Sequence, residues 1–367
     1  MEIKKTPFYE AHQGLEAKMV EFAGYLMPLW YESVKEEAIA VRKAAGLFDI
    51  SHMGKILIRG RNSLKLIQKL ITNDASRLKP GKICYALLCN EKGTVIDDIL
   101  VYGLGKEKYL LVSNAANAEK VLNWLKKWAK KEIGLFSPPE IILKDCPFLA
   151  LQGPKSEEIL RKVGLSETFL NLRYYQCKAG RIFGETAIIS RTGYTGEDGF
   201  EILIWEPKTP QVVWKKLLKA GRDLGLKPAG LAARDVLRLE AGLPLYGQEL
   251  SEEITALEAG LEKFVFFGKE FIGKEALLEQ KNRGLEKKLI GFEILSGRIA
   301  RPKYLILKEG REIGQVASGN ISHNLNKSIG TGFVKTDFSA PGTLIEIDIR
   351  GQKHPAKVSK LPFVKPR

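Results

Sequence analysis

The chain has 367 residues, of which 44% are hydrophobic and 28% charged, and this length and balance predict a soluble protein of two or three domains. Residues 1–13 lack the apolar core of a signal peptide, and no uninterrupted apolar run approaches a membrane span, so a cytoplasmic location is expected. The formal net charge of +15 indicates an acidic partner, which could be nucleic acid, a membrane surface, or an acidic protein or ligand.

Cysteine and histidine are scarce and scattered. The four cysteines, at positions 84, 89, 146 and 177, are too irregularly spaced for a disulfide framework, and none forms a CxxC pair. The four histidines form no HExxH motif and no tight cluster with the cysteines. We therefore expect no metal site.

Up to about residue 280, short strand-like runs alternate with helix-like runs. Strands are expected at residues 54–60, 109–114 and 199–205, and helices at residues 63–71, 121–132 and 209–225. The two kinds of run interleave without the regular alternation of a parallel barrel, which predicts an α+β fold. From about Lys287 to the end, short strands are separated by Gly, Asn and Pro turns, and we expect a small all-β domain there.

The stretch VLNWLKKWAKKE, from Val121 to Glu132, combines lysines with two tryptophans on one expected helix. One interpretation is a basic amphipathic surface that docks an acidic partner. The alternative is an ordinary surface helix, whose lysines face water while its aromatic side packs inward.

Two adjacent carboxylates, Asp97 and Asp98, lie in the apolar run NEKGTVIDDILVYGL. Successive side chains of a strand point to opposite faces, so the two aspartates are expected in different environments. The face of Asp98 would also carry Ile96, Leu100 and Tyr102. Because an isolated buried charge is costly, either the pair has a function, or one aspartate faces solvent while the other meets a backbone or arginine partner.

The stretch SRTGYTGEDGFEI has glycines at positions 193, 196 and 199 ahead of an expected strand, which lets a ligand come close to the backbone. It is not a phosphate loop, because it has no GxxxxGK and no helix follows it. Glu201 lies on the strand face opposite Phe200 and Ile202. A carboxylate there can accept two parallel hydrogen bonds from the planar edge of a pterin or guanine ring; the alternative is an ion-paired strand glutamate.

Two arginines, Arg234 and Arg238, lie one turn apart on the helix expected in GLAARDVLRLEAG. Arg234 can bind an anion through two parallel hydrogen bonds. The alternative is a network within the helix, for example Arg234 with Asp235 or Arg238 with Glu240.

Taken in order along the chain, these stretches resemble the T-protein family, the aminomethyltransferases of the glycine cleavage system. The likeness runs nearly end to end and is carried by TPFYEAHQGLEAKMVEFAGYLMPLWY, VRKAAGLFDISHMG, ITND, NEKGTVIDD, SNAANAEK, SRTGYTGEDGFE, AARDVLRLEAGLPLYGQEL, EFIGKEAL and SGNISHNLNKSIG. None of these motifs is a catalytic fingerprint by itself. Their number and their order carry the resemblance.

The resemblance implies a three-lobed α+β fold around a central funnel that holds tetrahydrofolate. Residues 1–280 would form two α+β lobes, one of them inserted at about residues 54–137, and residues 287–367 would form a C-terminal β-barrel. In the implied reaction, an aminomethyl group on the dihydrolipoyl arm of the acidic H-protein loses ammonia and gives its carbon to tetrahydrofolate, forming 5,10-methylenetetrahydrofolate. The H-protein would then be the counterpart of the positive net charge. Neither a metal nor a tightly bound redox cofactor is implied.

The resemblance also implies roles for single residues. Asp98 matches the essential aspartate, whereas Asp97 would be structural. Glu201 matches the residue that binds the pterin edge, and Arg234 matches a ligand-binding arginine. Further positions match residues that line the folate site: Met53, Tyr85, Tyr102, Val112 and Asn114. The chain ends at LPFVKPR, and Arg367 would replace the C-terminal contact of longer relatives to the glutamate tail if it reaches the ligand.

Two positions depart from the family pattern: Tyr25 stands where Trp is common, and Leu243 stands where some members have a Tyr near the folate tail. Folate-dependent demethylases share the fold, but their flavin domain needs a dinucleotide fingerprint that this sequence lacks. A non-catalytic folate-binding protein would carry a KGCYxGQ signature, and this chain has only KICY at residues 82–85. A basic nucleic-acid-binding protein agrees with the charge, but no aromatic RNP pattern or recognition-helix motif supports it.

Overall fold

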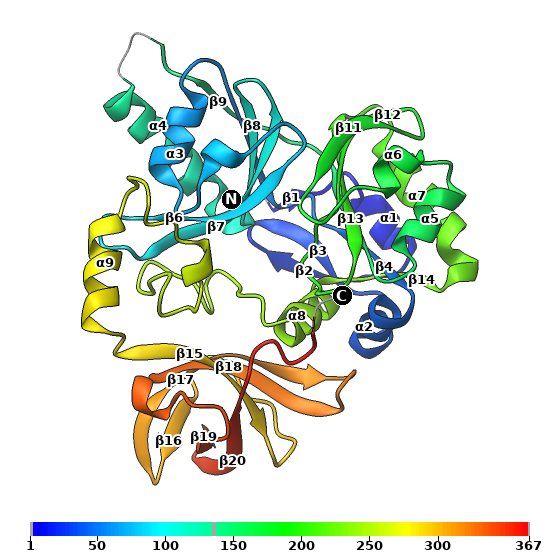
Figure 1. Ribbon diagram of the computed structural model, residues 1–367. Coiled ribbons are helices and arrows are strands. Elements are labelled where there is room, and N and C mark those ends of the chain that lie inside the picture. The colour runs from blue at the N-terminus through cyan, green and yellow to red at the C-terminus, as the bar shows by residue number, and fades with distance from the viewer. Residues whose placement is uncertain (1–2, 134–136, 366–367) are drawn as a thin grey trace.

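The computed structural model describes residues 3–133 and 137–365 (Figure 1). Two lobes of mixed helix and sheet lie above a closed barrel in Figure 1, and helix α8 (Leu231–Glu240) lies between these three parts. The α+β class and the C-terminal barrel expected from the sequence are confirmed.

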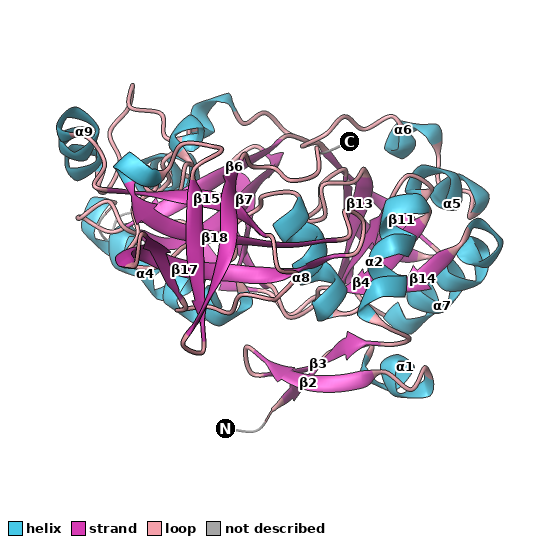
Figure 2. Ribbon diagram, turned by 90° about the horizontal axis from the view of Figure 1, so that it is seen from below, coloured by secondary structure: helices cyan, strands magenta, loops and turns pink. Residues whose placement is uncertain are grey.

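The chain begins with a small sheet in the order β1-β3-β2, made of β1 (Lys4–Lys5), β2 (Lys18–Phe22) and β3 (Tyr25–Trp30), with α1 (Tyr9–Gly14) beside it. Figure 2 shows this sheet at the lower edge, apart from the larger sheets. His12 of α1 ties the segment to the first lobe. Its Nε2 lies 2.9 Å from Oδ2 of Asp49, and its Nδ1 lies 2.8 Å from the hydroxyl of Tyr31.

A six-stranded sheet forms the first lobe, in the order β11-β12-β13-β10-β4-β14. Its strands are β4 (Ala45–Asp49), β10 (Phe148–Gln152), β11 (Cys177–Ile182), β12 (Glu185–Ser190), β13 (Gly199–Glu206) and β14 (Leu226–Pro228). The helices of this lobe are α2 (Val34–Lys43), α5 (Ser156–Lys162), α6 (Glu167–Leu170), α7 (Pro210–Gly221) and α8. Along β13, Phe200 and Ile202 point into the core that Trp214 of α7 helps to fill, which leaves Glu201 on the other face.

A five-stranded antiparallel sheet forms the second lobe, in the order β6-β7-β8-β5-β9. It is inserted between β4 and β10 and consists of β5 (Gly54–Arg59), β6 (Ile83–Cys89), β7 (Val95–Gly105), β8 (Lys108–Ser113) and β9 (Glu140–Leu143). Helices α3 (Ser63–Leu70) and α4 (Ala118–Glu132) contribute to its core. Val121, Leu125 and Trp128 of α4 are buried there, so the interpretation of an inward-packed aromatic side is confirmed.

The third part is a closed barrel in the order β15-β18-β17-β16-β19-β20. Its strands are β15 (Lys287–Ile294), β16 (Leu305–Lys308), β17 (Arg311–Ser322), β18 (Lys327–Lys335), β19 (Leu344–Ile349) and β20 (Gln352–Ser359), and α9 (Lys274–Arg283) precedes them. Ile290, Phe292 and Ile294 alternate into the barrel core. Gly330 gives the Phe292 ring its space, because an added Cβ would lie 2.5 Å from that ring. Short 3₁₀ turns complete the chain: η1 (Ala75–Arg77), η2 (Ala115–Asn117), η3 (Arg222–Leu224), η4 (Glu262–Phe264) and η5 (Thr336–Phe338).

Buried ion pairs hold α8 in place on both sides. Arg238 Nη1 lies 2.9 Å from Oε2 of Glu249, and Arg238 Nη2 donates to the hydroxyl of Ser318 in the barrel at 2.7 Å. At the end of the helix, Oε2 of Glu240 lies 2.7 Å from Nη2 of Arg42 on α2. Helix α8 is therefore fixed both to the first lobe and to the barrel.

The elements expected from the sequence are present. The strands expected at residues 54–60, 109–114 and 199–205 are β5, β8 and β13, and the expected helices are α3, α4, and α7 followed by η3. Within the described part of the chain, no helix is long and apolar enough to cross a membrane.

Candidate functional site

A β-bulge precedes the two aspartates on β7. Asp97 pairs with Leu88 of β6, and a shift in register next to this pair leaves Ile96 without a partner in the ladder. Ile96 packs into the core beside α3 and α4. The expectation that Ile96 shares the face of Asp98 is therefore wrong, because the bulge adds one residue to the alternation.

Asp97 is fully buried and accepts three hydrogen bonds. The backbone N–H and the Nδ2 of Asn114 donate to it at 3.0 and 2.8 Å, and the Nδ2 of Asn117 donates at 2.7 Å. Its partners are thus one backbone amide and two side-chain amides, so the backbone partner named in the alternative is present, and no arginine pairs with Asp97 among the described residues.

Asp98 is only partly buried and is held by two neutral donors. The hydroxyl of Tyr85 donates to Oδ2 at 3.0 Å, and the Nδ2 of Asn114 donates to Oδ1 at 2.7 Å. The same amide nitrogen also donates to Asp97, so the expectation that the two aspartates have separate environments is wrong. The strand points the carboxylates to different faces, but Asn114 reaches both from the end of β8.

Burial raises the pKa of Asp98, and the hydrogen bonds from Tyr85 and Asn114 offset this rise only in part. Burial, followed by the charge of Asp98, raises the pKa of Asp97. Among the described residues, no cation is a source of the shift at Asp98. A carboxylate held by neutral donors stays basic, which suits it to accept a proton.

Glu201 of β13 is a second buried carboxylate. Thr192 donates to its Oε2 at 2.5 Å, and the hydroxyl of Tyr102 donates to the same oxygen at 3.4 Å. Burial raises the pKa of Glu201, while Thr192, the charge of Arg234 and Tyr102 act in the opposite direction. Among the described residues Glu201 makes no ion pair within 4.0 Å, so the alternative of an ion-paired strand glutamate is wrong.

Arg234 of α8 carries a buried Nη1 that has no hydrogen-bond partner among the described residues. Its guanidinium lies over the ring of Tyr194, 4.8 Å from the ring centroid. The alternative network within the helix forms only in part: Asp235 pairs with Arg238 at 2.8 Å, and Glu240 pairs with Arg42 of α2 instead. Because an unpartnered buried N–H is costly, the free donor of Arg234 points to a ligand.

Three of the other expected site residues lie at the contact between the two lobes. Tyr102 and Val112 are buried in an apolar cluster that includes residues of both lobes, and Met53 packs at its edge. The ring of Tyr85 meets that of Phe264 edge-on, with centroids 4.6 Å apart. Arg367 lies outside the described residues.

Tyr194 was not predicted as a site residue, although it stands between Gly193 and Gly196 in the motif SRTGYTGEDGFEI. Burial raises the pKa of Tyr194, and the charges of Arg238, Asp98 and Arg234 all act on it. Its phenol is therefore within electrostatic reach of both Asp98 and Arg234, which belong to different parts of the fold. The sequence feature that could have identified Tyr194 is an aromatic residue inside a glycine-rich loop.

Two further features were also missed. The rings of Tyr174 and Tyr175 meet edge-on with centroids 4.5 Å apart, and Tyr175 packs against the apolar cluster that contains Tyr102. Nothing in the sequence singled the pair out. His52 is buried, and its Nδ1 has no partner in the described structure. Burial and the charge of Arg234 lower the pKa of His52 to about 3, so its imidazole is neutral at neutral pH.

These residues give the site two different chemical functions. Asp98, a basic carboxylate, can take a proton from a ligand amine. Glu201 accepts hydrogen bonds and Arg234 donates them, and together they can fix a ring that carries both kinds of group on its edge. Across residues 3–133 and 137–365, no group of three or more His, Cys, Asp and Glu side chains is arranged to hold a metal ion.

Comparison with known proteins identifies two matching families. The family described as GCVT N-terminal domain matches residues 8–269, and the family described as glycine cleavage T-protein C-terminal barrel domain matches residues 287–365. Curated aminomethyltransferases from Caldanaerobacter subterraneus subsp. tengcongensis and Moorella thermoacetica are each 46% identical to this chain. Both alignments cover 99% of this chain. They cover 96% of the Caldanaerobacter protein and 98% of the Moorella protein. The crystal structure of glycine cleavage system aminomethyltransferase T from Bartonella henselae matches with a TM-score of 0.91 at 33% identity, covering 100% of this chain and 99% of that one.

Proposed function

The chain belongs to the glycine cleavage T-protein family of aminomethyltransferases, and from this premise we propose that it transfers a one-carbon unit to tetrahydrofolate. The donor in this proposal is the aminomethyl group on the dihydrolipoyl arm of H-protein. The products are 5,10-methylenetetrahydrofolate, ammonia and the free dihydrolipoyl arm. The two hydrogens that leave N5 and N10 of tetrahydrofolate end on the ammonia and on the sulfur of the arm, so the reaction is balanced and uses no oxidant.

In this proposal Asp98 accepts the proton that a folate nitrogen loses as it forms its bond to the incoming carbon. Its ionised carboxylate also stabilises positive charge that develops on that nitrogen. A positioned general base contributes about a hundredfold to ten-thousandfold in rate. The observation that carries the proposal is that Asp98 is held by Tyr85 and Asn114, two neutral donors, so that no arginine or lysine suppresses its basicity.

The remaining residues hold the folate. Glu201 accepts hydrogen bonds from the amino-pyrimidine edge of the pterin, and the free Nη1 of Arg234 donates to an oxygen of the same ligand. Met53, Tyr102 and Val112 supply apolar contact for the flat ring. Burial of these groups excludes water and strengthens the electrostatic contacts.

H-protein is the proposed macromolecular partner, and the net charge of +15 supports an acidic partner. Opposite charges speed the encounter of two proteins, and salt screens them. The alternatives of a non-catalytic folate-binding protein and a nucleic-acid-binding protein are less favoured than the transferase, because the relatives matched over the full length of the chain are aminomethyltransferases.

The test is ammonia release from aminomethylated H-protein, measured with and without tetrahydrofolate at low and high salt. We expect release that depends on tetrahydrofolate and a second-order rate constant that falls as salt rises. Release at the same rate without folate would contradict the proposed acceptor. A rate that does not change with salt would contradict the electrostatic part of H-protein docking while leaving the folate chemistry intact.

A further inference from the structure

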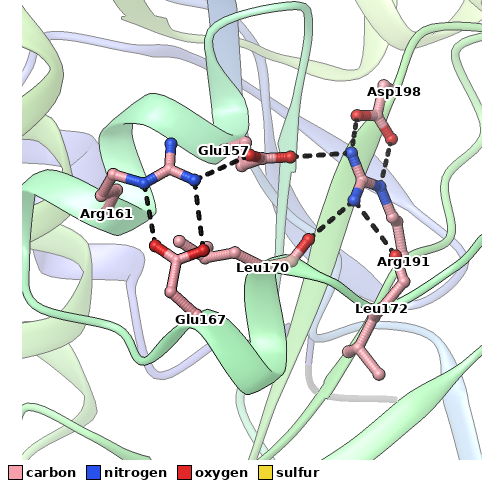
Figure 3. Close-up of polar contacts among 7 residues, drawn as sticks. All are labelled: Glu157, Arg161, Glu167, Leu170, Leu172, Arg191 and Asp198. Atoms are coloured by element: carbon pink, nitrogen blue, oxygen red, sulfur yellow. Dashed lines mark hydrogen bonds and ion pairs between the residues drawn. The ribbon is translucent and has the colours of Figure 1, made fainter.

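Arg191 opens the glycine-rich loop between β12 and β13, and all five N–H donors of its guanidinium have acceptors (Figure 3). Its Nε donates to Oδ1 of Asp198 at 2.8 Å, and its Nη2 donates to the other carboxylate oxygen of Asp198 and to Oε2 of Glu157 at 3.1 Å. Its Nη1 donates to the carbonyl oxygens of Leu170 and Leu172 at 2.8 and 3.1 Å.

These contacts join three separate segments of chain. The bidentate pair with Asp198 connects the two ends of the loop 191–198. The bonds to the carbonyls at the end of α6 attach the loop to the segment that leads to Tyr175. The main chains are attached as well, since Tyr175 N–H donates to the carbonyl of Arg191 at 3.0 Å, and Arg191 N–H donates to that of Gln176 at 2.9 Å.

The loop carries side chains at Glu201, and the other segment packs, through Tyr175, against the apolar cluster that contains Tyr102, a donor to Glu201. The loop places the Thr192 hydroxyl 2.5 Å from Oε2 of Glu201 and places the ring of Tyr194 beneath Arg234. The other segment carries Tyr174 and Tyr175, whose rings meet edge-on with centroids 4.5 Å apart. Tyr175 has a φ of +61°, a backbone conformation that an aromatic residue adopts only when its surroundings impose it. The contacts of Arg191 supply that constraint.

We propose that Arg191 is a positioning residue for ligand recognition, which sets the shape of the ring-binding edge at Glu201 by clamping the loop that carries Thr192 to the segment that carries Tyr175. This inference rests on the proposed function, because the ligand it concerns is tetrahydrofolate. Arg191 touches neither the ligand nor the reacting atoms in this scheme, and it acts on affinity through the two segments. Proton transfer at Asp98 is left to other residues.

The surrounding ion pairs provide a matched control. Glu157 is shared between Arg191 and Arg161, and Arg161 also pairs with Glu167 at 3.0 Å (Figure 3). Arg161 therefore belongs to the same network and lies on the neighbouring helix α5. In the described part of the chain its hydrogen bonds go to Glu157 and Glu167, and none reaches the loop. A substitution of Arg161 disturbs the network without loosening the loop.

The test compares Arg191→Lys with Arg161→Lys. Lysine keeps the charge but has three donors and no planar fork, so it cannot serve Asp198, Glu157 and two carbonyls together. The dissociation constant of tetrahydrofolate is measured by titration calorimetry, and kcat is measured at saturating tetrahydrofolate. For Arg191→Lys we expect a dissociation constant about ten- to a hundredfold higher, because one or two hydrogen bonds that position the loop are lost. We expect kcat to change by less than about threefold. For Arg161→Lys both quantities should stay within about twofold of wild type, as is usual for exposed ion pairs.

A second variant, Asp198→Asn, keeps Arg191 and removes the charge of its bidentate partner. It should raise the dissociation constant in the same direction, which keeps the inference open to test if Arg191→Lys does not fold. Unchanged folate affinity in a folded Arg191→Lys or Asp198→Asn protein, or a fall in kcat without a change in affinity, would overturn the inference alone. Wild-type protein that binds no tetrahydrofolate would overturn the proposed function and, with it, the ligand assigned to this clamp.

Discussion

The Nδ2 atom of Asn114 lies 2.7 Å from Oδ1 of Asp98, and the same atom lies 2.8 Å from Oδ1 of Asp97. One neutral amide therefore uses both of its hydrogens to join two carboxylates that adjoin each other in sequence. A cation in this position would lower the pKa of both aspartates, whereas an amide orients them and lets burial keep both pKa values raised. The basicity proposed for Asp98 depends on this arrangement.

Tyr85→Phe removes the hydroxyl that donates to Asp98 and keeps the ring beside Phe264. We expect kcat to fall about tenfold or more, because a hydrogen bond to a charged group contributes about 1.5–3 kcal/mol. The pKa of Asp98 should rise further, since its ionised form loses a donor. The measurement is kcat as a function of pH. Tyr109→Phe is the control, a buried tyrosine of the same lobe, and it should leave kcat unchanged.

Activity should depend on pH through Asp98, which must be ionised to accept a proton. Burial raises its pKa, so kcat/KM should decline on the acid side with a midpoint above the ~3.9 of an ordinary aspartate. The contribution of Asp98 to stability should depend on pH in the opposite direction to activity. A raised pKa in the folded state means that the contribution of Asp98 to the free energy of unfolding is full below the unfolded pKa and is lost as pH rises through the folded pKa. An acid limb at or below the ordinary value would contradict this environment for Asp98.

Arg234 and Arg238 are one turn apart on α8, but their substitution should have different effects. Arg234→Met removes a buried donor that has no partner among the described residues, so it should weaken folate binding about tenfold or more and change stability by less than ~1 kcal/mol. Arg238→Met leaves the buried carboxylate of Glu249 unpaired and should lower the free energy of unfolding by about 3–5 kcal/mol. Folate titration and urea unfolding of both variants separate the two effects. Equal loss of stability in both would contradict a ligand-binding role for Arg234.

The buried pair of His12 and Asp49 should stabilise the attachment of the N-terminal segment. Burial raises the pKa of Asp49, but the hydrogen bond and charge of His12 and further hydrogen bonds outweigh it and lower the pKa. His12→Phe should therefore lower the free energy of unfolding at pH 7 by about 3–5 kcal/mol, because it leaves a buried carboxylate unpaired. The contribution of a group with a lowered pKa is lost as pH falls through the folded pKa, so the gap between wild type and variant should shrink below about pH 4. Urea unfolding at several pH values measures this gap, and a gap independent of pH would be the contrary result.

Local patterns predicted much of the fold. Alternation alone placed Phe200 and Ile202 in the core and Glu201 on the opposite face of β13, because nothing interrupts that strand. The same rule misplaced Ile96, because the bulge depends on a distant segment. The N–H of Val95 donates to the carbonyls of Ser251 and Ile254, which lie far along the chain, and no sequence window around β7 contains that information.

The site was predictable to a similar extent. Family motifs identified the separate residues Asp98, Glu201 and Arg234, but the contacts that join them are long-range. Asn114 reaches the aspartates from the end of β8, and Arg191 holds the segment of Tyr174 and Tyr175 through the carbonyls of Leu170 and Leu172. Hydrogen bonds between such distant segments follow from tertiary packing, so the hydrophobic periodicity of one sequence cannot predict them.

The most direct test of the account is folate-dependent ammonia release from aminomethylated H-protein by Asp98→Asn, measured beside Asp97→Asn and together with the folate affinity of each folded variant. We predict that Asp98→Asn loses about a hundredfold to ten-thousandfold in rate while its affinity for tetrahydrofolate stays close to that of wild type. Asp97→Asn should keep more activity, because Asp97 orients Asn114 and does not itself take the proton. Full activity in Asp98→Asn, or complete loss in Asp97→Asn alone, would contradict the assignment of Asp98 as the proton acceptor.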